Sequence, residues 1–176
     1  MTILLAFYKG TRAENPAARF FDRLVCWWWP TRGRFSHVEL IDGSLNGRCW
    51  CHSSSIPDGG VRSKWINVLS GRWVIVAVPG FDQHGAAVWF TQHEGARYDY
   101  AGILGFALPF FKQRNRRFYC SEAVALAMQE IAKGSAPDVP LPWPPAQISP
   151  NGLFAWCVTQ PGAQIFLDPP TESSHA

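Results

Sequence analysis

The chain passes from an aromatic-rich run into an amphipathic helix within the stretch Phe118-Tyr119-Cys120-Ser121-Glu122-Ala123-Val124. The apolar residues after Cys120 recur at helical spacing, so the sequence predicts a helix whose first turn carries the cysteine. At that position the unpaired backbone N–H groups and the positive end of the helix dipole favour the thiolate form of a cysteine. Cys120 is therefore the candidate nucleophile.

The candidate base lies on a predicted strand at residues 35–41, which read Phe-Ser-His-Val-Glu-Leu-Ile. His37 and Glu39 share one face of this alternating strand. The polar turn that follows indicates a hairpin to a second strand, which carries His52. Because a hairpin places His52 on the neighbouring strand, we expect Cys120, His37 and His52 to act as nucleophile, base and orienting residue. Glu39 is the alternative orienting residue.

In chain order, these segments resemble the circularly permuted branch of the NlpC-type cysteine peptidases, within the papain-like superfamily. The motifs that carry the resemblance are Ser36-His37-Val38-Glu39-Leu40, Cys51-His52-Ser53-Ser54-Ser55, Asp58-Gly59-Gly60-Val61-Arg62, Tyr98-Asp99-Tyr100 and Tyr119-Cys120-Ser121-Glu122. The histidines precede the cysteine, which is the order that permutation produces.

The resemblance implies an α+β, permuted papain-like fold, in which the nucleophile-bearing helix packs on an antiparallel sheet. It implies the same catalytic roles for Cys120 and His37, and it matches His52 to the third polar position of the family. Family members include peptidoglycan endopeptidases and amidases, and related permuted proteins act on lipid acyl groups. Phage genomes also carry proteins of this type, so tail proteins of a virion are expected partners.

We therefore expect a hydrolase that cleaves an amide bond in peptidoglycan peptides through a thioester on Cys120. The backbone N–H of Cys120 and one further donor would hold the oxyanion, and Tyr98 and Tyr119 are candidates for the cleft or for this contact. One alternative is an acyltransferase or thioesterase on lipid acyl groups, suggested by the apolar residues 102–111. The other is a structural tail protein that uses the fold for assembly.

Tryptophans are concentrated before the His37 strand, where Trp27, Trp28 and Trp29 follow one another. Three consecutive tryptophans cannot all face one core, so we expect either two buried and one at an edge, or a contact surface for substrate or partner. Three others lie within regular apolar patterns and are expected in the core: Trp65, Trp73 and Trp89.

The chain has 176 residues, of which 47% are hydrophobic, and this suits one domain with a sizeable core. We expect the hydrolase fold to span residues 1–133, with residues 134–176 as a proline-rich arm and tail of the same domain. The net charge is +3, and no basic face with interleaved aromatic residues is present, so nucleic acid is not an expected partner.

The five cysteines form no obvious disulfide framework, and Cys49-Trp50-Cys51-His52 lacks a second ligand pair at zinc-site spacing. We therefore expect no metal and no cofactor. No apolar run reaches membrane-spanning length, and no signal peptide is visible. These features predict synthesis in a cytoplasm without a transmembrane segment, with incorporation into a virion as one route out of the cell.

Overall fold

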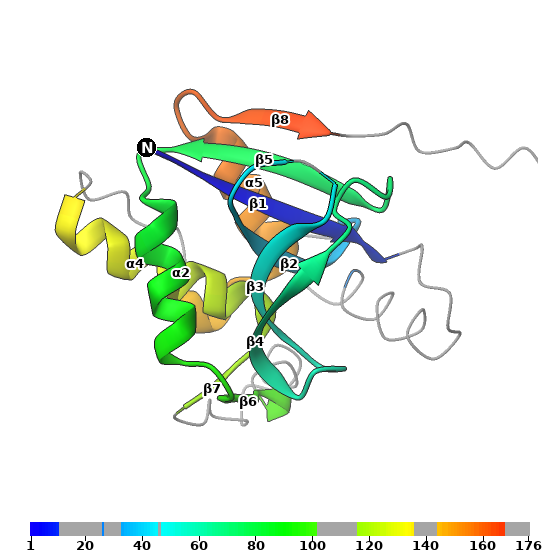
Figure 1. Cartoon of the computed structure of the whole chain (residues 1–176), viewed down its shortest axis with the longest axis vertical. Helices are drawn as coiled ribbons and strands as arrows, with labels where there is room; N and C mark the ends of the chain where they lie inside the picture. Colours follow the sequence, from blue (N-terminus) through cyan, green and yellow to red (C-terminus); the bar gives the residue numbers. More distant parts are fainter. Residues whose placement is uncertain (11–25, 27–32, 46, 102–115, 136–143, 168–176) are drawn as a thin grey trace, which may run out of the picture.

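The computed structural model describes residues 1–10, 26, 33–45, 47–101, 116–135 and 144–167 (Figure 1). In the helix α4 (Cys120–Ser135), side chains are described as far as residue 130. The structure is α+β: helices pack on one face of a curled mixed sheet. Trp27, Trp28 and Trp29 lie outside the described residues, as do the apolar segment 102–111 and the tail after residue 167.

The sheet follows the order β7-β6-β4-β3-β2-β1-β5-β8. Its strands are β1 (Thr2–Lys9), β2 (Phe35–Asp42), β3 (Cys49–Ser55), β4 (Gly60–Ile66), β5 (Trp73–Pro79), β6 (Arg97–Tyr98), β7 (Arg117–Phe118) and β8 (Gln164–Leu167).

All neighbouring strands pair antiparallel except β6 and β7, which are parallel. The expectation of an antiparallel sheet is therefore correct for the long strands and wrong at this edge. Residues 99–116 connect β6 to β7, and such a long connection allows the crossover that parallel neighbours require.

The helices are α2 (Gln83–Gln92), α4 (Cys120–Ser135) and α5 (Pro150–Thr159), with a short 3₁₀ turn η2 (Pro145–Gln147) before α5. Side chains that flank two of them act as N-caps, as their sequences indicate. Asp82 accepts hydrogen bonds from the backbone of His84 and Gly85 at the start of α2. Ser149 accepts one from Gly152 at the start of α5. Residues 144–167, part of the expected arm, thus supply a helix and the edge strand β8.

The main core lies between the helices and one face of the sheet. It includes Leu5 and Phe7 of β1, Val38 and Leu40 of β2, Val74 and Val76 of β5, and the apolar sides of α2, α4 and α5. A smaller cluster, with Ala6, Ile41, Cys51 and Ile75, lies on the opposite face of the same strands. Alternation along β2 therefore sends Val38 and Leu40 to the helices, and His37 and Glu39 to the other face.

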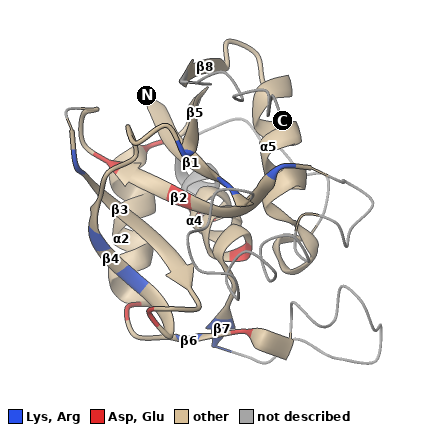
Figure 2. Cartoon of the chain, turned by 90° about the vertical axis from the view of Figure 1, so that its right-hand side faces the viewer, with Lys and Arg blue, Asp and Glu red and all other residues tan. Residues whose placement is uncertain are grey.

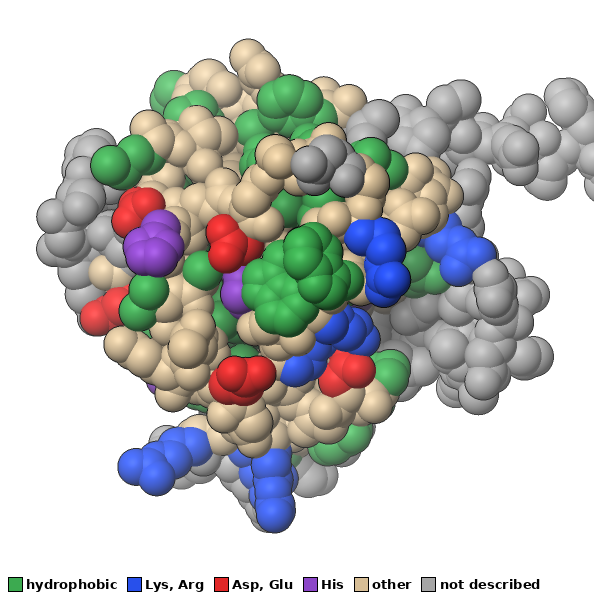
Figure 3. All heavy atoms as spheres, in the orientation of Figure 1, with side chains coloured by type: hydrophobic (Ala, Val, Ile, Leu, Met, Phe, Trp, Pro, Cys, Tyr) green, Lys and Arg blue, Asp and Glu red, His purple; other side chains and the backbone are tan. Residues whose placement is uncertain are grey.

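Trp73 and Trp89 are buried, whereas Trp65 of β4 is 56% exposed, so its expected place in the core is wrong. Its ring packs edge to face on Trp50 of β3, with centroids 5.4 Å apart. Hydrophobic side chains gather over the strands on the face seen in Figure 3, flanked by charged residues. Within the described residues, no helix is both long enough and apolar enough to cross a membrane.

Candidate active site

Cys120 is the first residue of α4 and is 4% exposed. The helix start is capped from within, because the backbone N–H of Tyr119 donates to Glu122 Oε2 at 3.3 Å, which is one half of a capping box. Ser54 Oγ of β3 donates to the carbonyl oxygen of Phe118 at 2.6 Å. This bond attaches the backbone two residues before Cys120 to the sheet.

Two more side chains fix the start of α4 to the segment before α5. Ser121 Oγ donates to the carbonyl of Ile148 at 2.7 Å, and the Tyr119 hydroxyl donates to the carbonyl of Pro145 at 3.1 Å. Since the Tyr119 hydroxyl proton is engaged in this bond, Tyr119 supports the helix start, and the oxyanion role considered for it is not what the structure indicates.

The first residues of β2 are held by α5. The side-chain amide of Asn151 accepts from the backbone N–H of Phe35 at 2.9 Å and donates to the carbonyl of the same residue at 3.0 Å. Between Phe35 and His37 the register against β1 shifts, so that Ser36 has no partner on that strand. Such a bulge re-aims the neighbouring side chains, and both Ser36 and His37 line the cleft described below.

The structure brings Cys120, His37 and Glu39 together. His37 Nε2 lies 2.7 Å from Glu39 Oε1, and Cys120 is close enough to the imidazole to act on its pKa. Because Glu39 occupies Nε2, Nδ1 is the ring nitrogen left to meet the thiol. Burial works to lower the pKa of His37, but the charge of Glu39 and the interaction with Cys120 raise it to about 9. The imidazole is therefore held between a thiol and a carboxylate.

His52 does not lie beside His37, so the expected third member of the site is wrong. In the β2–β3 pairing His52 lies opposite Leu40, and cross-strand partners share a face. Its Nδ1 lies 2.7 Å from Ser63 Oγ, and its ring stacks on Phe90 of α2 with centroids 5.6 Å apart. A shift of one residue in the hairpin register would have reversed this orientation. His52 is a core histidine, and Glu39 takes the position next to His37.

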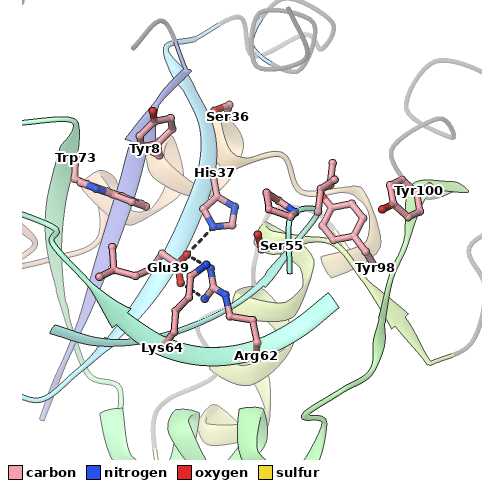
Figure 4. A pocket seen from close by; sticks show the side chains of 13 residues that line it. Tyr8, Ser36, His37, Glu39, Ser55, Arg62, Lys64, Trp73, Tyr98 and Tyr100 are labelled. Carbon is pink, nitrogen blue, oxygen red and sulfur yellow. Dashed lines mark hydrogen bonds and ion pairs between the residues drawn. The ribbon is translucent and has the colours of Figure 1, made fainter. Parts of the chain in front are cut away.

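Glu39 is also bound by Arg62 of β4. Arg62 Nη1 donates to Oε2 at 2.7 Å and Nη2 donates to Oε1 at 2.5 Å (Figure 4). Burial works to raise the pKa of Glu39, but the hydrogen bonds and charges of Arg62 and His37 lower it to about 2. Arg62 belongs to one of the quoted motifs, but sequence analysis assigned it no role, because the two residues are 23 positions apart.

A cleft of about 680 Å³ opens beside His37 (Figure 4). Aromatic side chains line it on both sides of the histidine: Tyr8 and Trp73 on one side, Tyr98 and Tyr100 on the other. The remaining lining residues are Ser36, Glu39, Ser55, Ile56, Pro57, Arg62, Lys64 and Ile66. The volume is in the range of small-molecule sites, and its walls suit an apolar group.

Tyr98, a sequence candidate for the cleft or for the oxyanion contact, lines this cleft and is 4% exposed. Burial, followed by the nearby Cys120, raises its pKa well above the usual range for a phenol. Its hydroxyl group therefore stays protonated, so that Tyr98 can donate a hydrogen bond.

No family model matches the chain, and no match to it was found among curated proteins or solved structures. The functional interpretation of the site therefore depends on its residues and their geometry. Three features have to be explained together: a cysteine at a helix N-terminus, a histidine whose pKa it influences and a buried carboxylate that contacts that histidine.

Proposed function

We propose that the protein is a cysteine hydrolase that cleaves an amide bond by acyl transfer to Cys120. The observation that carries this proposal is that His37 is shared between Cys120 and Glu39. A nucleophile, a base in contact with it and a third group that orients the base are the parts that covalent acyl transfer requires.

In the proposed reaction, His37 takes the proton of the Cys120 thiol, and the thiolate attacks the carbonyl carbon of the amide. The C–N bond then breaks as the imidazolium gives its proton to the leaving amine, which leaves a thioester on Cys120. Water, deprotonated by His37, attacks the thioester carbonyl. The acid departs and the sulfur regains the proton from His37.

Glu39 stabilises the imidazolium that forms in each half of this reaction. Its buried carboxylate faces Nε2 and is ionised at neutral pH, since its pKa is lowered to about 2. The backbone N–H of Cys120 at the helix start is one proposed oxyanion donor, and the Tyr98 hydroxyl is the second. Each such donor stabilises a transition state by about 3 kcal/mol.

We further propose that the fold is a circularly permuted papain-like fold. The support for this proposal is the order of the parts: the histidine strand comes first in the chain, and the cysteine helix packs on the same sheet afterwards. Peptidoglycan peptides are the proposed substrate class, on the strength of the ordered motifs alone.

The test is digestion of purified sacculi by wild type, by Cys120→Ala and by Cys49→Ala, with mass spectrometry of the released fragments. Cys49 is a buried cysteine outside the cleft, so its variant is a matched control. Muropeptides released by wild type and Cys49→Ala only are the expected result, and their masses identify the bond. Release by Cys120→Ala would refute the cysteine mechanism.

A second substrate class is favoured by the walls of the cleft. Tyr8 and Trp73 on one side of His37 and Tyr100 on the other present apolar surface, which suits a hydrocarbon chain, and Ile66 also lines the cleft. Lipid acyl groups are therefore the alternative, with a thioester on Cys120 in common. Incubation with phosphatidylcholine vesicles followed by intact mass spectrometry distinguishes the two: a fatty-acyl mass on Cys120, with no release from sacculi, would select the lipid.

A further inference from the structure

Glu39 is a buried carboxylate on a face of the sheet that is otherwise largely apolar. It is 1% exposed, and its neighbours in the same face include Ala6, which is its partner on β1, and Ile41. A buried charge of this kind is costly unless it is paired and hydrogen-bonded. The means by which this site keeps Glu39 ionised is therefore part of how it works.

Arg62 reaches Glu39 across a whole strand. Glu39 lies on β2 and Arg62 on β4, with β3 between them. The β3 residue paired with Arg62 is Ser53, which is small and fully buried, and its hydroxyl turns away to donate to the carbonyl of Val38 at 2.7 Å. A small side chain at this position leaves room for the guanidinium to pass over β3.

The third nitrogen of the guanidinium is held by Asp58, in the hairpin between β3 and β4. Arg62 Nε donates to Asp58 Oδ2 at 2.8 Å, and Lys64 Nζ lies 2.5 Å from the same oxygen. In Figure 2 the cationic residues of β4 and an acidic residue of β2 lie on either side of β3. Arg62 thus has all three nitrogens engaged by carboxylates, so its position is strongly determined.

We propose that Arg62, held by Asp58, is a positioning residue that keeps Glu39 ionised and aims one carboxylate oxygen at His37. This inference deepens the proposed function and rests on it for its catalytic meaning. Arg62 also lines the cleft, but in this role it acts on the reaction through Glu39.

The charged and titratable groups around the imidazole define the consequence of losing Arg62. His37 faces Cys120 from α4 and Glu39 from its own strand, and the nearest cation in this network is Arg62 of β4. Without that cation Glu39 keeps a single partner, His37, and burial then dominates its titration. Without Arg62, the carboxyl group of Glu39 takes up its proton at a higher pH than in the wild type. At acidic pH the imidazolium of His37 then lacks the negative charge of Glu39.

The experiment follows two readouts in wild type, Arg62→Met, Arg62→Lys and Arg48→Met. Arg48 is the matched control, since its guanidinium donates to the carbonyl of Trp65, outside the cleft. The first readout is the titration of Glu39 by carboxyl ¹³C NMR, assigned by the signal that Glu39→Gln removes. The second is the rate of Cys120 alkylation by iodoacetamide against pH.

In Arg62→Met we expect Glu39 to titrate roughly 1–3 pH units higher than in wild type, and the acid side of the alkylation profile to move up by about one unit. Arg62→Lys, which keeps the charge without the paired geometry, should fall between, and Arg48→Met should match wild type. In a Glu39→Gln background, Arg62→Met should cause no further shift of the profile.

An unchanged Glu39 titration in folded Arg62→Met overturns the inference, whatever the enzyme does. If Arg62→Met does not fold, Arg62→Lys and Asp58→Asn carry the test, and an unchanged titration in both overturns it equally. A second outcome separates the two proposals: the titration of Glu39 shifts as expected, but wild-type Cys120 is no more reactive than the other cysteines. That outcome would refute the proposed hydrolase and would support the effect of Arg62 on Glu39.

Discussion

His37 and Glu39 are two residues apart on β2, and their side chains meet on the cleft face of the sheet, with Nε2 and Oε1 2.7 Å apart. Neighbouring same-face residues on a strand lie close enough for this contact, so a single strand supplies both the base and the group that orients it. The cysteine comes from the other side of the sheet, at the start of α4.

Replacement of Glu39 by Gln should lower the upper pH limit of activity. Because Glu39 raises the pKa of His37, which is about 9 in the native protein, its removal lets the imidazolium lose its proton at lower pH. We expect a loss of roughly 2- to 10-fold in kcat/KM at pH 8, because a decrease of one to two units from a pKa of about 9 lowers the imidazolium fraction at that pH by this factor. The pH dependence of Cys120 alkylation and of hydrolysis measures this. An unmoved alkaline limit would show that Glu39 does not act on His37.

The stability of the fold should also depend on pH through the same pair. The folded pKa of His37, about 9, lies above its ordinary 6.5, so its contribution is complete below pH 6.5 and is lost as pH rises through 9. The folded pKa of Glu39, about 2, lies below its ordinary 4.5, so its contribution is complete above pH 4.5 and is lost as pH falls through 2. We expect the highest free energy of unfolding between these limits.

Urea unfolding across this pH range measures the effect, which is on the order of 1–3 kcal/mol at each end. The two losses reflect one shared interaction, so they are not added. His37→Asn is the informative comparison, because it should remove the alkaline loss. The same alkaline loss in that variant would assign the effect to another group.

His52→Ala should reduce stability and leave catalysis nearly intact. The imidazole is buried, stacks on Phe90 and bonds Ser63, so its removal leaves a cavity and an unpaired hydroxyl. Together these cost about 2–4 kcal/mol. Chemical denaturation and kcat/KM at a temperature where the variant is folded separate the two effects. A catalytic loss as large as that of His37→Ala would restore His52 to the active site.

Asn151→Ala should loosen the start of β2. The amide of Asn151 satisfies both the N–H and the carbonyl of Phe35, 116 residues away in the chain, next to the bulge that aims His37. We expect a loss of about 1–3 kcal/mol in the free energy of unfolding and faster hydrogen exchange at the Phe35 amide. The exposed Asn67 gives the control variant Asn67→Ala. Equal hydrogen exchange at the Phe35 amide in the two variants would contradict this role of Asn151.

Several secondary-structure elements can be predicted from local sequence patterns. The alternation in residues 35–41 predicts β2 and puts His37 and Glu39 on one face, and the periodicity after Cys120 predicts α4. The turn after Asp42 predicts the hairpin, and Ser149-Pro150 predicts the start of α5. These elements can be predicted because each depends on residues that are only a few positions apart in the chain.

The sequence by itself thus determined β2, the hairpin to β3, the helix that begins at Cys120 and the shared face of His37 and Glu39. Only the tertiary structure decided which groups meet. The register of the hairpin turned His52 toward the helices, and the order of the strands brought Arg62 over β3 to Glu39. Side-chain periodicity is local, whereas register and strand order depend on how the whole sheet buries its apolar face, which no short segment encodes.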